Sequence, residues 1–130
     1  MRLLLDTCAI LWVVSDPDQL STSTQKMLVA DDTEILVSPM SCAEICCLVA
    51  KKRIQLDRHW KLWFRHHTEK NGWNSVPVDL PIIEEAYSLQ GDFHSDPVDR
   101  IIVATARFFD AMIITADQKM IAYPHVRSER

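Results

Sequence analysis

Three short apolar runs, each followed by a segment of helix length, constrain the fold of this chain more than any other feature. The runs cover residues 3–5, 34–38 and 112–114. Short buried strands that alternate with helices are typical of a mostly parallel sheet with helices on both faces. The alternation therefore predicts an α/β fold, a three-layer α/β/α sandwich with a mostly parallel central sheet. The length favours a single domain that spans residues 1–130.

Helix start and stop signals predict the remaining elements. Asp96 is expected to cap a long helix that has Pro97 at its first position. A short edge strand is expected at 76–78, because Pro77 cannot donate a hydrogen bond to a central ladder. Residues 127–130 are expected to form a frayed basic end. The other expected helices cover residues 8–14, 21–30, 41–52, 59–70, 81–89 and 118–122.

The small number of glycines excludes several kinds of active site. The chain contains two, Gly72 and Gly91. It therefore lacks the glycine-rich loop of dinucleotide-binding folds, the Walker A phosphate loop and the GxSxG nucleophile elbow. Any chemistry must come from side chains. The formal charge of −4, with 25% charged and 48% hydrophobic residues, is typical of a soluble, core-forming chain.

The composition also predicts a cytoplasmic protein without a membrane span. No apolar run approaches the roughly 20 residues that a transmembrane helix needs. The four cysteines lie inside apolar segments and show no spacing typical of a disulfide framework. They are therefore expected to be reduced thiols, as in the cytosol.

Four acidic residues lie where the predicted topology would bring them to one edge of the sheet. Asp6 directly follows the first strand, and Asp117 closely follows the last apolar run. Glu44 and Asp99 lie near the starts of two expected helices. In open α/β sheets, ligands bind beyond the carboxyl ends of the strands. We therefore expect the four side chains to meet there in one cleft.

A cluster of carboxylates repels itself unless it binds protons or a cation. Oxygen ligands without an accompanying cysteine or histidine pattern favour Mg²⁺ or Mn²⁺ over Zn²⁺. These ions polarise phosphoryl oxygens and lower the pKa of a bound water. The four acids together therefore predict a metal-dependent phosphodiesterase.

Each acid also has a structural interpretation that needs no metal. Glu44 would complete a capping box with Ser41, because Ser-x-x-Glu is typical of helix starts. Asp99 would interact favourably with the dipole at the start of its helix, and Asp117 would cap a short helix. Asp6 is harder to explain in this way, because a carboxylate at the inner end of a buried strand is costly without a partner.

Four segments in this order resemble the PIN domain. They are Leu3-Leu4-Leu5-Asp6-Thr7, Ala43-Glu44-Ile45, Asp96-Pro97-Val98-Asp99-Arg100 with its continuation to Ala106, and Ile114-Thr115-Ala116-Asp117. The order and spacing of the acids match, and the resemblance covers essentially the whole chain. The family usually has phenylalanine at the position of Val98, a departure expected to affect packing only. The chain is most similar to small bacterial members, the VapC-like toxins of VapBC-type toxin–antitoxin pairs.

The resemblance implies a PIN-like α/β/α fold and an Mg²⁺- or Mn²⁺-dependent endoribonuclease that leaves 5′-phosphate and 3′-hydroxyl ends. The residues that would hold the metal and activate water are Asp6, Glu44, Asp99 and Asp117. Thr115 would hydrogen-bond a carboxylate or water, and Asp96 would be an additional metal-site acid at the rim. Toxin members typically form homodimers, and a cognate antitoxin neutralises them by placing its tail in the active-site groove.

An acidic protein that binds RNA must localise its positive charge. The densest basic region begins with Lys51, Lys52 and Arg53. This region would either contact phosphates of the substrate or form a solvated helix end. Trp60, Trp63 and Phe64 would either stack on unpaired bases or pack in the core or a dimer interface. Their helical spacing favours packing.

Other catalytic patterns fit the chain less well. Cys47 and Arg53 have the spacing of cysteine phosphatases, yet Cys47 lies inside an expected helix with no glycine nearby. Cys8 stands where haloacid-dehalogenase hydrolases need a second aspartate. His94 and His125 would be either surface residues or bases. The alternative from a different class is a catalytically inert PIN-like module whose groove serves only a protein partner.

Overall fold

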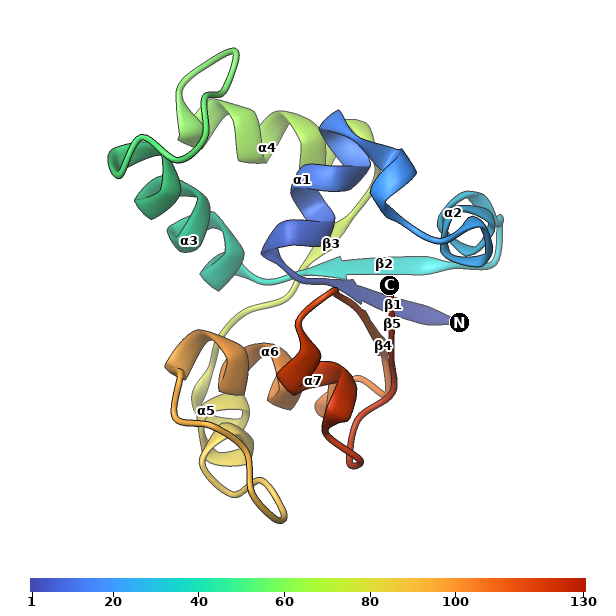
Figure 1. Ribbon diagram of the computed structural model, residues 1–130, viewed down its shortest axis with the longest axis vertical. Helices are drawn as coiled ribbons and strands as arrows, with labels where there is room; N and C mark the ends of the chain where they lie inside the picture. The colour runs from blue at the N-terminus through green and yellow to red at the C-terminus, as the bar shows by residue number, and fades with distance from the viewer.

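Strand β1 (Arg2–Leu5) forms the centre of a five-stranded sheet in the computed structural model, which describes residues 1–130 (Figure 1). The strand order is β3-β2-β1-β4-β5, and all neighbouring strands are parallel. The other strands are β2 (Glu34–Val37), β3 (Asn74–Ser75), β4 (Met112–Ile114) and β5 (Ser128–Glu129). Because the sheet is parallel throughout, the carboxyl ends of all its strands lie at one edge.

Helices cover both faces of this sheet, so the predicted α/β/α sandwich is confirmed (Figure 1). One face carries α1 (Thr7–Ser15), α3 (Pro39–Ala50) and α4 (Trp60–Lys70). The other carries α5 (Leu80–Ala86), α6 (Pro97–Phe108) and α7 (Gln118–Ala122). A 3₁₀ turn, η1 (Pro17–Gln19), leads to α2 (Thr22–Val29) at one end of the sheet. None of the helices has the length and apolar character needed to cross a membrane.

The side chains of β1 alternate between two apolar cores, as expected for a strand with both faces covered. Leu3 and Leu5 are fully buried in the core beneath α1, α3 and α4. Leu4 is fully buried in the opposite core, where it packs with residues of α6 and α7. This double burial fixes the position of the residue that follows β1, Asp6.

Helix α3 begins earlier than predicted, so the capping-box interpretation of Ser41 and Glu44 is wrong. Ser38 caps the helix by accepting a hydrogen bond from the Met40 amide at 3.1 Å. Pro39 occupies the first helical turn, where its missing N–H costs nothing. Ser41 is therefore buried inside the helix, and Glu44 is free of a capping role.

Three further boundaries differ from the prediction. The edge strand β3 ends before Pro77, although the Val76 amide still donates to Val37 O at 3.0 Å. Helix α5 ends at Ala86, three residues early, and Arg100 donates to the carbonyl of this last residue at 2.9 Å. The chain end is not frayed: β5 pairs with β4, and the Ile113 amide donates to Arg127 O at 2.9 Å.

Candidate active site

The four predicted acids line one cleft of about 300 Å³ beyond the carboxyl ends of β1, β2 and β4. Asp6 and Asp117 lie after β1 and β4, and a backbone hydrogen bond of 3.2 Å from Asp6 N to Ile114 O joins the two strand ends. Glu44 enters the cleft from α3 and Asp99 from α6. The rest of the lining is Thr7, Cys8, Trp12, Ile102, Ala116 and Met120.

The Asp6 carboxyl is the most deeply placed of the four. Its residue is 8% exposed, and its Oδ1 caps α1 by accepting a hydrogen bond from Ala9 N at 2.8 Å. Burial raises the pKa of Asp6, and the negative charges of Glu44 and Asp117 raise it further. Hydrogen bonds from the Thr115 hydroxyl and the Ala9 amide act in the opposite direction. These two donors therefore favour the ionised carboxylate in a setting that otherwise opposes it.

Two hydroxyl groups orient the neighbouring carboxylates. The Thr7 hydroxyl donates a hydrogen bond to Glu44 Oε1, which links the start of α1 to α3. The Thr115 hydroxyl also accepts a hydrogen bond from Asp117 N at 2.9 Å, so one side chain connects Asp6 with Asp117. Asp117 caps α7, and its Oδ1 accepts from Lys119 N at 2.8 Å.

Asp99 shows the strongest electrostatic effect in the cleft. Its pKa is raised to about 7, first by burial and then by the negative charges of Asp96, Asp117, Glu44 and Asp6. The Asp96 side chain caps α6 by accepting from Asp99 N at 3.0 Å, which confirms the predicted cap. Asp96 does not line the cleft itself.

His94 lies against Asp99, a contact that the sequence pattern does not indicate. Its Nε2 is 2.9 Å from Asp99 Oδ2, and both side chains are about one-fifth exposed (22% and 20%). The ring nitrogen has no partner with hydrogen-bond geometry, so the two groups are in close contact without a directed hydrogen bond. His94 belongs to the segment before α6, whose sequence has no periodic pattern that would have marked it as a site residue. For Thr7, the only sequence signal of a role in the site was its position next to Asp6.

Cys8 does not provide a nucleophile in this cleft. Burial raises the pKa of its thiol, and the charges of Asp6, Glu44, Asp117 and Asp99 raise it further. Because the thiolate is the reactive form of cysteine, these surroundings suppress nucleophilic attack by Cys8. The chemistry of the cleft therefore rests on carboxylates and hydroxyls.

The donor set of the cleft fits a hard divalent cation whose coordination shell is completed largely by water. No group of three histidine, cysteine, aspartate or glutamate side chains is arranged to hold a metal ion together. Mg²⁺ is commonly bound through one or two carboxylates while it keeps several waters. The raised pKa values of Asp6 and Asp99 show that added positive charge would stabilise the ionised carboxylates.

The basic and aromatic candidates lie away from the acids. Lys51, Lys52 and Arg53 are exposed in the turn after α3 and do not line the cleft. Trp63 and Phe64 are buried in the core beneath α4, which confirms packing as their role.

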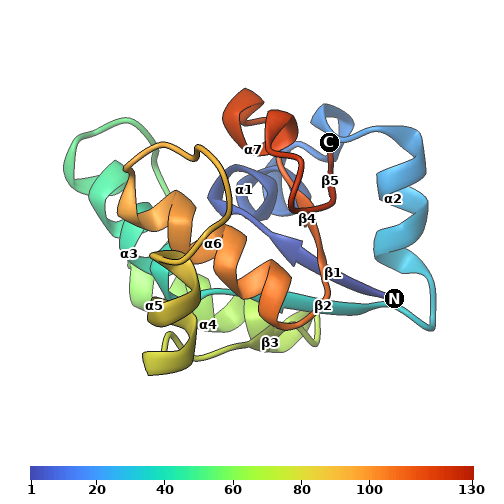
Figure 2. The same cartoon turned by 90° about the horizontal axis from the view of Figure 1, so that it is seen from below.

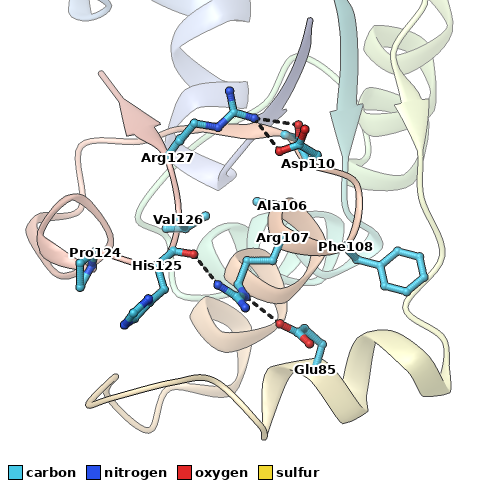
Figure 3. Close-up of a pocket in the computed structure, with 10 residues that line it drawn as sticks. Glu85, Ala106, Arg107, Phe108, Asp110, Pro124, His125, Val126 and Arg127 are labelled. Atoms are coloured by element: carbon cyan, nitrogen blue, oxygen red, sulfur yellow. Dashed lines mark hydrogen bonds and ion pairs between the residues drawn. The ribbon is translucent and has the colours of Figure 1, made fainter.

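A hollow of about 600 Å³, larger than the acid cleft, is not the candidate active site. It lies near the start of β4, where the Arg107 guanidinium group lies between Glu85 Oε1 and the His125 carbonyl, at 2.7 and 2.6 Å (Figure 3). Arg127 pairs there with Asp110 Oδ1 at 3.0 Å. Both arginines are neutralised by acids of the same hollow, whereas the smaller cleft concentrates charge of one sign.

Comparisons with known proteins agree with this geometry. The sequence profile of the PIN domain matches residues 3–126. Ribonuclease VapC22 of Mycobacterium tuberculosis is 28% identical over 124 residues, which cover 95% of this chain and 93% of that protein.

The fold is similar to that of VapBC2 from Rickettsia felis, crystallised with a DNA fragment from their promoter. The TM-score is 0.71 at 16% identity, and the match covers 99% of this chain and 98% of that chain. It is also similar to a toxin–antitoxin complex from Klebsiella pneumoniae, with TM-score 0.62, 22% identity and coverage of 95% and 94%. With a parallel sheet that brings four ordered acids into one cleft, and a family profile that matches nearly all of its length, the chain belongs to the PIN domain family.

Proposed function

We propose that this protein is a metal-dependent endoribonuclease and the toxin component of a toxin–antitoxin pair. The observation that carries the proposal is the meeting of Asp6, Glu44, Asp99 and Asp117, from four distant segments, in one cleft. The likeness to the ribonuclease VapC22 supports the RNA substrate. The likeness to proteins crystallised as toxin–antitoxin complexes supports an antitoxin partner, and a homodimer is the assembly we expect.

The chain's own groups have distinct tasks in the proposed hydrolysis. A bound Mg²⁺ or Mn²⁺ would supply charge neutralisation at the phosphoryl oxygens and a lower pKa for the attacking water. The carboxylates of Asp6, Glu44, Asp99 and Asp117 would hold the cation. The Thr115 hydroxyl would orient the Asp6 carboxylate and favour its ionised form, and the Thr7 hydroxyl would orient Glu44. Water attacks the phosphodiester in line, and the cleavage leaves a 5′-phosphate and a 3′-hydroxyl.

Substitution of single acids tests this assignment. Asp6→Asn and Asp99→Asn should each reduce RNA cleavage at least about 100-fold, since removal of a charged group that acts in the transition state commonly costs about 3 kcal/mol or more. Cleavage of a labelled RNA is measured in Mn²⁺, and circular dichroism verifies the fold. Asp31→Asn, an exposed acid outside the cleft, is the matched control. Activity retained by either cleft variant would refute the assignment.

A second function, a binding module without catalysis, is favoured by one observation: the acids are not arranged as a ready-made metal site. A metal titration separates the two functions. An endonuclease of the proposed kind should show a rise in melting temperature with Mn²⁺ that is absent in Asp6→Asn, because a ligand that binds the native state stabilises it. Absence of both a metal effect and cleavage would favour the binding module.

A further inference from the structure

A second hollow of about 310 Å³ lies beside the acid cleft and is not used by the proposed hydrolysis. Its walls are the segment that leads into α6, with Phe93 and His94, and helix α7, with Lys119. In Figure 2 the orange segment before α6 passes close to α7, in agreement with this lining.

The hollow shares a wall with the acid cleft. His94 lines the hollow, while its Nε2 lies 2.9 Å from Asp99 in the cleft. Helix α7 separates the two spaces: Met120 lines the cleft and Lys119 lines the hollow. The hollow is therefore adjacent to the cleft, and His94 connects the lining of the hollow to Asp99.

Three aromatic rings, the aromatic platform, line this hollow; the ring planes are tilted by 48° between Phe93 and His94 and by 58° between Phe93 and Tyr123. The rings of Phe93 and His94 have their centroids 4.6 Å apart, and those of Phe93 and Tyr123 are 5.0 Å apart. Tyr123 is buried, and its hydroxyl donates to Gln90 O at 2.6 Å, which fixes the platform to the preceding segment. Phe93 and His94 remain partly exposed. Partly exposed aromatic rings are the groups on which unpaired bases stack.

The hollow is lined by one cationic and one acidic side chain. Lys119 is exposed, is the only lysine or arginine of the lining and takes part in none of the ion pairs of the structure. Asp92, exposed on the opposite segment, repels phosphate. A nucleotide would thus direct its phosphate to Lys119 and its base to Phe93.

We propose that this hollow is a nucleotide subsite of the RNA substrate, in which Phe93 stacks on one unpaired base and Lys119 contacts a backbone phosphate beside the scissile bond. The proposal rests on the ribonuclease function proposed above, because that function makes RNA the occupant of the neighbouring cleft.

Binding without turnover gives the first test. Fluorescence anisotropy measures the affinity of the full-length protein for a fluorescein-labelled, unstructured oligoribonucleotide of random sequence, in EDTA. Phe93→Leu should weaken binding about fivefold or more, since stacking is worth about 1–3 kcal/mol per base. Lys119→Gln should weaken binding and reduce the slope of log affinity against log salt by about 0.7, the value for one phosphate contact to a single strand. Phe108→Leu and Lys70→Gln, both exposed elsewhere, are the matched controls.

Cleavage kinetics give the second test and separate the two proposals. In Mn²⁺, the two variants should raise KM while kcat stays within about twofold, because the subsite contacts substrate away from the reacting atoms. Wild-type cleavage with unchanged KM in both variants would overturn the subsite and leave the ribonuclease intact. RNA binding that is weakened in both variants, without any cleavage, would support the subsite and refute the ribonuclease. Absence of both binding and cleavage in the wild type would refute both. If Phe93→Leu lowers the melting temperature, the exposed Lys119→Gln decides the outcome.

Discussion

Among the acids of the cleft, Asp99 has the carboxyl group whose ionisation is most strongly disfavoured. Its pKa of about 7 means that, without a cation, the group is roughly half protonated at neutral pH. Burial and four neighbouring acids produce this value together, so the effect belongs to the assembled cleft and not to the local sequence. A cation in the cleft would remove the main reason for protonation, and metal affinity should therefore rise with pH.

The raised pKa of Asp99 predicts that replacing this residue with a neutral one stabilises the protein, and that the gain depends on pH. In the unfolded chain an aspartate has a pKa of about 3.9. A group with a raised folded pKa contributes stability below the unfolded value and loses it as the pH rises towards and through the folded value, here from about 4 to about 7. In EDTA, Asp99→Asn should therefore be more stable than the wild type at pH 8, by about 1–4 kcal/mol, with a smaller difference at pH 5.

Chemical denaturation at the two pH values measures this difference, with Asp31→Asn as the control. Equal stability of Asp99→Asn and the wild type at pH 8 would show that the acids do not repel one another as the structure implies.

Helix and strand boundaries show what local sequence patterns can and cannot predict here. The strands β1, β2 and β4 are short apolar runs that are buried on both faces, and their burial makes them recognisable. Strand β5 consists of Ser128 and Glu129, which have no apolar pattern and form a strand only because they pair with β4. The acids after β1 and β4 were predictable from their positions at strand ends.

The contacts around these acids were not predictable in the same way. His94 reaches Asp99 from an irregular segment, and Thr7 reaches Glu44 across 37 positions of sequence. Such contacts depend on the packed arrangement of helices, which no spacing within a single segment encodes. The capping-box pattern at Ser41 failed for a related reason, because Ser38 and Pro39 offer a better helix start.

The position at which α3 begins predicts that alanine substitutions of Ser38 and Ser41 differ in their effect on stability. Ser38→Ala should destabilise the protein by about 1 kcal/mol, the usual cost of a lost N-cap. Ser41→Ala should be neutral or stabilising, because the buried Ser41 hydroxyl has no hydrogen-bond partner. Urea denaturation of both variants checks the pair. A larger loss for Ser41→Ala than for Ser38→Ala would instead support the capping box.

At the scale of the whole molecule, the densest basic segment of the chain lies away from the acid cleft. The chain carries a net charge of −4, and the cleft collects four acids. Lys51 to Arg53 lie beyond the end of α3, roughly 10 Å along the helix axis from Glu44 at 1.5 Å per residue.

Neutralisation of the basic turn, Lys51 to Arg53, should weaken the binding of RNA irrespective of its sequence. The triple variant Lys51→Gln, Lys52→Gln and Arg53→Gln should reduce the salt slope of log affinity by up to about 2, since each phosphate contact to a single strand contributes about 0.7. Anisotropy at several salt concentrations measures the slope. A variant with Lys26→Gln and Lys70→Gln removes charge from other helices as the control. An unchanged slope in the triple variant would show that the basic turn does not contact RNA and is only a solvated helix end.

The chemistry of the RNA ends tests the central claim most directly. A cleft that uses four carboxylates and a divalent cation to direct water at the phosphodiester leaves a 5′-phosphate and a 3′-hydroxyl. Mass spectrometry of the products from a defined RNA, with Mn²⁺ and with EDTA, distinguishes this outcome from attack by the ribose 2′-hydroxyl. We predict Mn²⁺-dependent products with 5′-phosphate ends. Products with 2′,3′-cyclic phosphate that form equally well in EDTA would contradict the account.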